Sequence, residues 1–314
     1  MVSVYFEKFC RGCLFTMLSL LWSGIVVATP ATRQDCRPDE ETTQKTTRPL
    51  VYSNALLWKI SKKGQQASYI FGTIHVSDPR ITNLPEPVHA AINSARVFVM
   101  EALPDQEEGR KLTRMMFFND GKKLHDYLDN DLFTRAANIL DDYRIASESI
   151  NLLKPWAAFI IMSYPSGDGV PLDLQLLGTA RNQGLETRGL ETLSEQGQVF
   201  SSMDIKSQVR LLLDTLCHYD KVSSDFETMK LLYLKKDLQA LYSYSQKYSF
   251  PGDKLYDDLF QRLLIDRNRM MAERMQQVLD GGNAFIAIGA MHLPGDDGVL
   301  ALLEKQGYTI TAVY

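Results

Sequence analysis

Two histidines stand in the same short motif at opposite ends of the chain. Each closes a Gly-x-x-His motif: Gly72 begins the one that ends at His75, and Gly289 begins the one that ends at His292. Two neutral imidazoles and a carboxylate form a recognised ligand set for divalent metal ions, and this set leaves room for water. A bound ion can lower the pKa of water to about 7 and so supply a nucleophile for hydrolysis. The repeated motif therefore predicts one shared site.

Two glutamates and an arginine are the further candidates. Glu101 follows the apolar run 97–100 and Glu191 follows the run 185–190, and either carboxylate could orient water or act as a general base. Arg267 lies in a long helical segment and could bind substrate. Simpler roles fit as well: Glu101 could cap a helix, Glu191 could interact with a helix dipole, and Arg267 could form a structural salt bridge. Asp173 opens a helical segment and is predicted to be its cap.

The elements that carry these residues are short apolar runs. The runs 69–71 and 284–288 end at Gly72 and Gly289, and such runs are typical of strands buried on both faces. A glycine at the end allows a sharp turn, so that the next polar side chain projects beyond the sheet edge. Ligands bind outside the carboxyl ends of strands in open parallel sheets. We therefore expect the four strand-end residues, two histidines and two glutamates, to converge if their strands are neighbours.

The predicted fold class is α/β, with a mixed, mainly parallel sheet built from N- and C-terminal β-α-β units. The N-terminal unit has a hairpin over 55–61 and 66–71, a helix over 84–95 and a strand over 97–100. The C-terminal unit has a strand over 284–288, a helix over 299–305 and a strand over 308–313. A large helical insertion is predicted between them, at about 105–280, with helices over 132–141, 155–164, 172–181, 206–219 and 256–279. Residues 51–314 are expected to form a single domain.

The N-terminal residues resemble an export signal. Lys8 and Arg11 precede an apolar run that ends near Ala28, which predicts a signal peptide at 1–28 and an exported protein, periplasmic or secreted. An uncleaved anchor is the alternative. Residues 29–50 are polar and are predicted to be a flexible leader. Cys36 and Cys217 would remain after cleavage, either as a disulfide or as two free thiols.

Composition excludes one class of partner. The chain has 314 residues, 45% of them hydrophobic, which is ample for a packed core. The formal net charge is −4. Nucleic-acid binding therefore has no electrostatic support.

Several motifs together resemble the TraB/GumN family. They are Leu57-Trp58-Lys59-Ile60, the run from Tyr69 to His75, Glu101, Lys154-Pro155-Trp156, Leu172-Asp173, Gly189-Leu190-Glu191-Thr192 with Glu195-Gln196, Arg267-Asn268-Arg269-Met270 and the run from Gly289 to Gly295 with Gly298-Val299-Leu300. The resemblance implies a superfamily that includes the TIKI secreted metalloproteases, the pheromone-shutdown proteins, and more distant haem-binding and erythromycin-esterase-like members. The segment 231–241 departs from the family pattern, because it lacks the tryptophan and Gly-Asp often found there.

The resemblance also implies roles for individual residues. In TIKI-like proteins two Gly-x-x-His motifs and a glutamate are thought to form a metal-dependent centre, and these positions fall on His75, Glu101 and His292. Glu191 and Arg267 match other recurrent polar positions, which we assign to catalysis. The ion could be Mn²⁺, Co²⁺ or Zn²⁺, since imidazole and carboxylate suit all three.

The leading hypothesis is an exported metal-dependent hydrolase, a TIKI-like metallopeptidase, with a peptide or protein as substrate. Contact with a membrane is expected only through the export signal. A second hypothesis is a non-catalytic periplasmic binding protein that sequesters a peptide or a haem-like ligand. A third is an envelope protein that binds a partner and keeps a vestigial site.

Overall fold

The computed structural model describes residues 29–37, 48–167, 169–247 and 253–314. The predicted signal peptide at 1–28 lies outside the described residues, and so does the part of the predicted leader at 38–47. Within the described residues, no helix has the length and apolar character needed to span a membrane.

One mixed sheet organises the part of the fold built from the two chain ends. Its six strands have the order β4-β3-β5-β2-β1-β6, with the bounds β1 Leu57–Ser61, β2 Ser68–Thr73, β3 Val97–Ala102, β4 Glu186–Glu191, β5 Ala284–Gly289 and β6 Thr309–Ala312. The strands β4, β3, β5 and β2 pair in parallel, while β1 pairs antiparallel with β2 and β6. The predicted α/β class and the mainly parallel sheet are therefore confirmed.

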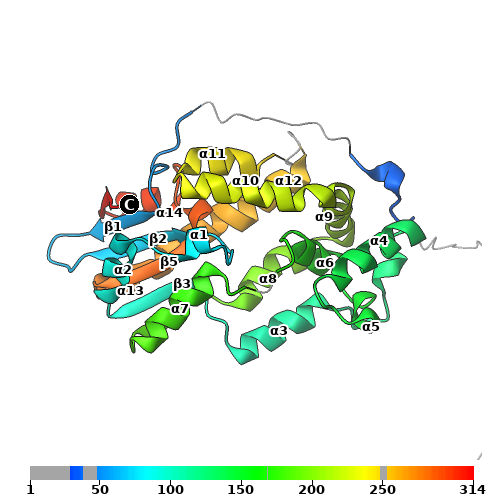
Figure 1. The fold of residues 1–314 in the computed structure, drawn as a ribbon, viewed down its shortest axis with the longest axis horizontal. Helices are drawn as coiled ribbons and strands as arrows, with labels where there is room; N and C mark the ends of the chain where they lie inside the picture. The colour runs from blue at the N-terminus through cyan, green and yellow to red at the C-terminus, as the bar shows by residue number, and fades with distance from the viewer. Residues whose placement is uncertain (1–28, 38–47, 168, 248–252) are drawn as a thin grey trace, which may run out of the picture.

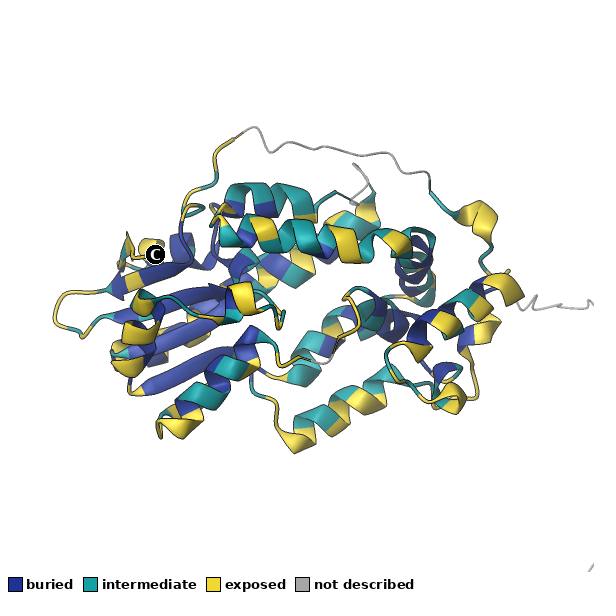
Figure 2. Cartoon of the chain, in the orientation of Figure 1, coloured by how far each residue is buried: buried dark blue, intermediate teal, exposed yellow. Residues whose placement is uncertain are grey.

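The C-terminal strand β5 lies between the two strands of the N-terminal unit. It pairs with β2 on one side and with β3 on the other, so β2 and β3 are parallel without being neighbours. Every residue of β5 up to Ile288 is buried, as expected for a strand covered on both faces. Figure 2 shows the same burial along the central strands. Residues from the two ends of the chain therefore meet at the centre of one sheet.

Helices from the two ends and from the middle of the chain cover this sheet. The first hydrophobic cluster joins the strands to buried residues of α2, α7, α13 and α14, whose bounds are Glu86–Asn93, Leu172–Asn182, Asp266–Asp280 and Val299–Lys305. Each helix contributes apolar residues at helical spacing, for example Met271, Met275 and Val278 on α13. The short helix α1, Pro79–Thr82, contacts α7 and α10.

A second hydrophobic cluster lies in the helical insertion. It is formed by buried residues of α4, α5, α6, α8, α9 and α12, with bounds Asn130–Asp141, Ser147–Ile150, Pro155–Met162, Leu193–Ser201, Ile205–His218 and Lys254–Phe260. The helices α3 Gln106–Met116, α10 Val222–Leu234 and α11 Leu238–Ser245 complete the insertion. Figure 1 shows the sheet in one half of the molecule and the helices α4, α5 and α6 in the other, while buried residues of α10 and α11 belong to the first cluster.

The predicted long helix over 256–279 is interrupted. It consists of α12, a five-residue π-helical turn at Gln261–Ile265 and α13. A π turn inserts extra backbone into a helix and is frequent at functional sites. The apolar spacing on either side is helical, so the interruption could not be predicted from the sequence. The π turn ends immediately before Asp266 and Arg267.

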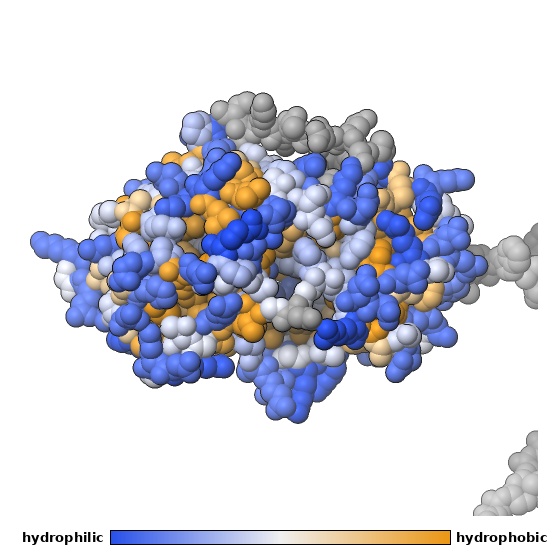
Figure 3. All heavy atoms as spheres, viewed as in Figure 1, coloured by the Kyte–Doolittle hydropathy of each residue, from blue (hydrophilic) through white to orange (hydrophobic). Residues whose placement is uncertain are grey.

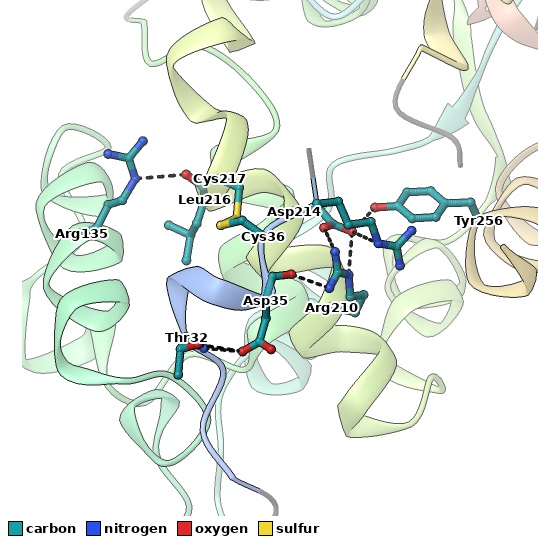
Figure 4. The surroundings of a disulfide bond; sticks show 10 residues. Thr32, Asp35, Cys36, Arg135, Arg210, Asp214, Leu216, Cys217 and Tyr256 are labelled. Carbon is teal, nitrogen blue, oxygen red and sulfur yellow. Dashed lines mark hydrogen bonds and ion pairs between the residues drawn. A yellow bond between two sulfur atoms is a disulfide. The ribbon is translucent and has the colours of Figure 1, made fainter. Parts of the chain in front are cut away.

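The predicted flexible leader does not hold for residues 29–37. Ala31 forms a backbone bridge with Leu128, and a disulfide joins Cys36 to Cys217 of α9, with the two Cα atoms 5.8 Å apart. The main-chain carbonyl of Asp35 also accepts a hydrogen bond from Arg210, at 2.9 Å (Figure 4). This polar segment is ordered by a covalent bond and local hydrogen bonds, which composition does not reveal.

Candidate active site at the carboxyl ends of the strands

The four predicted strand-end residues lie at one edge of the sheet. His75 follows β2, Glu101 is the penultimate residue of β3, Glu191 ends β4, and His292 lies in the 3-10 turn after β5. Because these four strands are parallel and consecutive in the sheet order, their carboxyl ends share one edge. The face in Figure 3 is hollowed near its middle, with both polar and apolar side chains around the hollow.

His75 is oriented by Asp173, the second residue of α7. Its Nδ1 atom lies 2.6 Å from Asp173 Oδ2, and the other carboxylate oxygen of Asp173 accepts a hydrogen bond from Thr73 Oγ1. A carboxylate only accepts, so Nδ1 carries a proton, and in the neutral imidazole Nε2 keeps its lone pair. The hydrogen bond to Asp173 raises the pKa of His75 above its ordinary value, although burial opposes this. The His75 side chain is 50% exposed, so Nε2 is accessible.

Asp173 was predicted to be a helix cap, and this prediction is wrong. Pro171 occupies the N-cap position of α7, and the Asp173 side chain is directed to Thr73 and His75 instead. The Asp173 side chain is 7% exposed. Its buried position is explained by these two polar partners, both from the end of β2.

His292 is oriented in the same manner by Asn268 of α13. Its Nδ1 atom lies 2.6 Å from Asn268 Oδ1, and Asn268 Nδ2 donates to the Asp297 carbonyl at 2.8 Å. That carbonyl can only accept, which fixes the orientation of the amide and makes Nδ1 of His292 the donor. The Nε2 atom of His292 therefore also keeps its lone pair. Burial lowers the pKa of His292 to about 4, so its imidazole is neutral at pH 7.

Glu101, Glu191 and Arg267 form one buried ion-pair network. Arg267 Nη2 donates to Glu101 Oε2 at 2.6 Å and also to Glu191 Oε1, while its Nε lies 3.1 Å from Glu191 Oε1. Gln196 bridges the two carboxylates, at 2.9 Å from Glu191 and 3.3 Å from Glu101. The fourth contact of Arg267 is the Leu263 carbonyl in the π turn. The Nε and Nη2 groups of the guanidinium thus hold the two carboxylates, while Nη1 binds the main chain.

The remaining oxygen of Glu101 faces the two partners that β5 provides. Glu101 Oε1 accepts the Gly289 backbone N–H at 2.7 Å and lies 3.6 Å from His292 Nε2. Burial alone would raise the pKa of Glu101, but the charges of His292 and Arg267 and the Gly289 N–H lower it to about 2. Since His292 is neutral at pH 7, Arg267 and Gly289 are what keep this carboxylate ionised there.

Both motif glycines are required for space. A Cβ atom on Gly289 would lie 3.1 Å from Glu101 Oε1 and 3.4 Å from His292 Cδ2, and one on Gly72 would lie 2.6 Å from Leu293 Cδ1. Gly289 has a φ of −53°, which any residue can adopt. The sharp turn that was predicted from the sequence is therefore not the reason why glycine is required at these two positions. They let the two histidine-bearing segments approach their neighbours.

The donor set suits a divalent cation. With neutral imidazoles, the three carboxylates of Glu101, Glu191 and Asp173 face the single guanidinium of Arg267, which leaves a formal charge of −2. Two ligands of one tetrahedral ion at about 2.1 Å are about 3.4 Å apart. The separation of Glu101 Oε1 and His292 Nε2, 3.6 Å, is close to this value and too long for a hydrogen bond.

His75 does not complete a ligand cluster in this conformation. Among the described residues, no three His, Cys, Asp or Glu side chains are grouped closely enough to hold a metal ion. His75 is nevertheless near enough for its charge to lower the pKa values of both Glu101 and His292. The structure thus brings His292 and Glu101 together, with His75 in the same electrostatic environment.

Three residues of the site were not predicted from the sequence. Asp173 and Asn268 orient the two imidazoles, and Gln196 bridges the two glutamates. The only sequence signal was that they lie inside the family-like motifs, since Asn268 follows Arg267 and Gln196 follows Glu195.

The fold and the site define a class of protein, an α/β protein with histidines and carboxylates at the carboxyl edge of a mainly parallel sheet. Residues 56–312 match the TraB/PrgY/gumN family, and the chain therefore belongs to this family. No solved structure is significantly similar to the chain.

The curated relatives are named metalloproteases. Metalloprotease TIKI1 of Danio rerio is 26% identical over 354 residues, covering 95% of this chain and 71% of the relative. Metalloprotease TIKI2 of Danio rerio is 26% identical over 332 residues, covering 87% and 64%. Metalloprotease TIKI1 of Homo sapiens is 25% identical over 314 residues, covering 82% and 61%. The chain thus spans 61–71% of the length of these three relatives.

Proposed function

We propose that this protein is an exported, metal-dependent peptidase. The observation that carries the proposal is the pair of imidazoles whose Nδ1 protons are engaged by Asp173 and Asn268, which leaves both Nε2 lone pairs available. Histidines that bind metals almost always have such a partner on their other nitrogen. The names of the relatives support the choice of peptide bonds as the target.

His75, Glu101 and His292 would hold the ion. When bound, a divalent cation supplies electrostatic activation of water and of the substrate carbonyl. Glu101 is better suited to be a ligand than a general base, because a carboxyl with a pKa of about 2 is a weak proton acceptor. Mn²⁺, Co²⁺ and Zn²⁺ all remain candidates, since the site offers imidazole nitrogen and carboxylate oxygen.

Glu191 and Arg267 would act through Glu101. The Glu191 side chain is only 1% exposed, and both of its oxygens accept from Arg267. The Nε and Nη2 groups of Arg267 are occupied by Glu101 and Glu191 in turn. We therefore assign them a positioning role, in which they fix the Glu101 carboxylate and keep it ionised.

Export is supported by two features of the chain. The N-terminal sequence has the layout of a signal peptide. The Cys36–Cys217 disulfide is of the kind that persists in oxidising compartments such as the periplasm or the extracellular space. Expression with cell fractionation tests this proposal: recovery of the chain only from the cytoplasm, with residues 1–28 still attached, would contradict it.

Metal analysis combined with peptide hydrolysis tests the proposed activity. Purified protein should contain or bind a divalent ion, lose hydrolysis on chelation and regain it when Mn²⁺, Co²⁺ or Zn²⁺ is restored. The substitutions His75→Ala and His292→Ala should each abolish hydrolysis and weaken metal binding by at least about tenfold. His89→Ala is a matched control, because His89 is exposed on α2, away from the strand ends.

Two results would contradict the proposal. If a folded protein keeps its metal content and its hydrolysis after both substitutions, the assignment of the metal site to His75 and His292 is wrong. Tight binding of peptide or haem without turnover, even with metal restored, would favour the alternative of a sequestering protein. The ion-pair network of Glu101 would then serve the fold alone.

A further inference from the structure

A largely apolar cavity lies between the two hydrophobic clusters of the molecule. Its volume is about 430 Å³, which falls in the range of pockets for small ligands, about 300–1,000 Å³. Helices α6, α9, α10 and α12, the π turn and Met291 form its wall. The apolar side chains that line it are Phe159, Leu211, Val222, Phe226, Met229, Leu259, Phe260, Leu263, Leu264 and Met291.

The cavity adjoins the candidate active site at three places. Met291 lines it and is followed directly by His292. Leu263 lines it, and the Leu263 carbonyl accepts a hydrogen bond from Arg267 at 3.2 Å. Its wall is therefore built from the same two segments that carry His292 and Arg267.

Tyr164 provides the third connection. Its ring contacts that of Phe226, a lining residue, with the centroids 5.4 Å apart. Burial raises the pKa of Tyr164, and the negative charges of Glu101 and Asp173 raise it further, so the ring that contacts Phe226 is electrostatically coupled to the site. Tyr164 is also 41% exposed, so part of its side chain lies at the surface.

The acidic groups of the cavity wall are satisfied within the protein. Asp214 accepts hydrogen bonds from Arg210 at 3.0 Å and from Tyr256 at 2.6 Å. Asp225 accepts from Tyr244 at 2.6 Å and lies 3.4 Å from Lys247. Neither carboxylate therefore calls for a cationic ligand. The surface left for an occupant is mainly aliphatic and aromatic.

We propose that this cavity is the specificity pocket of the site and receives a large apolar side chain, aromatic or branched aliphatic, of a bound peptide. This inference rests on the proposed function for its choice of ligand. The main chain of the peptide would lie beside His292 and Arg267, with the neighbouring side chain buried against α10. Peptides with Phe or Leu at the position whose side chain enters the cavity should bind about 10- to 100-fold more tightly than peptides with Ala there.

Binding and hydrolysis of one peptide series test the pocket. The probes are quenched fluorescent octapeptides that are identical except at one central position, which carries Ala, Leu, Phe or Asp. Met229→Trp should fill the cavity and reduce the preference for Phe and Leu over Ala to about threefold or less. Leu231→Trp is the matched control, because Leu231 lies on the same helix but is 45% exposed and does not line the cavity.

A second variant guards against misfolding. Val222→Trp fills the same cavity from the first turn of α10, and Val222 is only partly buried. Circular dichroism and thermal unfolding should show that at least one of the two blocking variants keeps the native fold. Loss of the Phe and Leu preference in a folded blocking variant, with the preference retained in Leu231→Trp, supports the pocket.

The two proposals can fail separately. If the peptides are hydrolysed but a folded blocking variant keeps the full preference, the pocket assignment is overturned while the peptidase stands. If the preference appears in binding and is lost on blocking, but no peptide is ever hydrolysed, the pocket stands and the peptidase fails. Equal binding of all four peptides, or binding of none, overturns the pocket.

Discussion

His292 Nε2 lies 3.6 Å from Glu101 Oε1, and neither atom hydrogen-bonds the other. Glu101 lies on β3, and His292 follows β5. Each side chain is fixed by a hydrogen bond on its other polar atom, His292 by Asn268 and Glu101 by Arg267. Gly289 makes the approach possible, since its N–H binds the carboxylate and its missing side chain leaves room for the ring. An unprotonated nitrogen and an ionised oxygen at this separation would be two of the three ligands of the proposed metal site.

Substitution of Gly289 by Ala should damage the site more than the fold. The added Cβ would lie 3.1 Å from Glu101 Oε1 and 3.4 Å from His292 Cδ2, so one of these side chains must shift. We expect metal affinity to fall by about 10- to 100-fold, measured by calorimetric titration of the metal-free protein. Gly178→Ala, on α7, is the control, because its added Cβ meets nothing within 4 Å. An unchanged affinity in Gly289→Ala would argue against the paired ligands.

The stability of the metal-free protein should fall in mild acid. Burial lowers the pKa of His292 to about 4, below the unfolded value of about 6.5. The folded protein therefore binds fewer protons, and the stability due to neutral His292 is lost as pH falls from about 6.5 to 4. The free energy of unfolding should decrease by about 2–3 kcal/mol over this interval. Urea unfolding near pH 7 and near pH 4.5 measures it.

The titration of His75 and Glu101 does not cause the same loss of stability between about pH 6.5 and 4. The pKa of His75 is raised, so its contribution is complete below about 6.5 and is lost only at higher pH. Glu101, with a pKa of about 2, stays ionised throughout the interval. His292→Gln should therefore remove most of the pH dependence. If this variant loses stability in acid as steeply as the wild type, another group is responsible.

A reductant should destabilise the protein by breaking the Cys36–Cys217 disulfide. The Cys36–Cys217 disulfide closes a loop with a sequence separation of 181 residues and ties the segment at 29–37 to α9. Removing such a bond typically costs about 2–5 kcal/mol. We expect Cys36→Ser/Cys217→Ser to lose about this amount in urea unfolding, and wild type with reductant to match it. If the double variant remains as stable as the oxidised wild type, the attachment of the segment at 29–37 to α9 does not contribute to the free energy of unfolding.

The strand-end residues of the site could be predicted from the sequence because local rules fix them. A buried apolar run identifies a strand, and parallel strands share a carboxyl edge, so His75, Glu101, Glu191 and His292 follow from their positions alone. The same rules gave the α/β class and the hairpin of β1 and β2.

The supporting contacts could not be predicted, because they depend on tertiary geometry. Asp173 lies 98 positions from His75 and acts through a helix whose packing angle no local pattern specifies. The disulfide could likewise not be predicted, because its formation depends on the position of α9 relative to the N-terminal segment. Gly289 was singled out correctly but for the wrong reason, since its value lies in the space beside Glu101 and not in a turn.

Arg267 should be the residue on which the stability of the site depends most. It lies between Glu101 and the Glu191 side chain, which is 1% exposed, so Arg267→Met would leave a buried carboxylate without its counter-charge. Breaking a buried pair in this way costs about 3–5 kcal/mol. Arg267→Lys should recover only part of this, because an ammonium cannot reproduce the planar contacts to both glutamates. Arg269→Lys is the control, since Arg269 is 54% exposed and should change stability by less than about 0.5 kcal/mol.

A double substitution separates this electrostatic cause from simple loss of packing. If the unpaired charge of Glu191 is what destabilises Arg267→Met, then adding Glu191→Gln should restore about 1–3 kcal/mol, because the neutral amide carries no buried charge. Urea unfolding of the wild type, both single variants and the double variant gives the coupling free energy. Additive losses in this cycle would mean that Arg267 stabilises the protein through its aliphatic stem, and the view that it neutralises the buried charge of Glu191 would have to be abandoned.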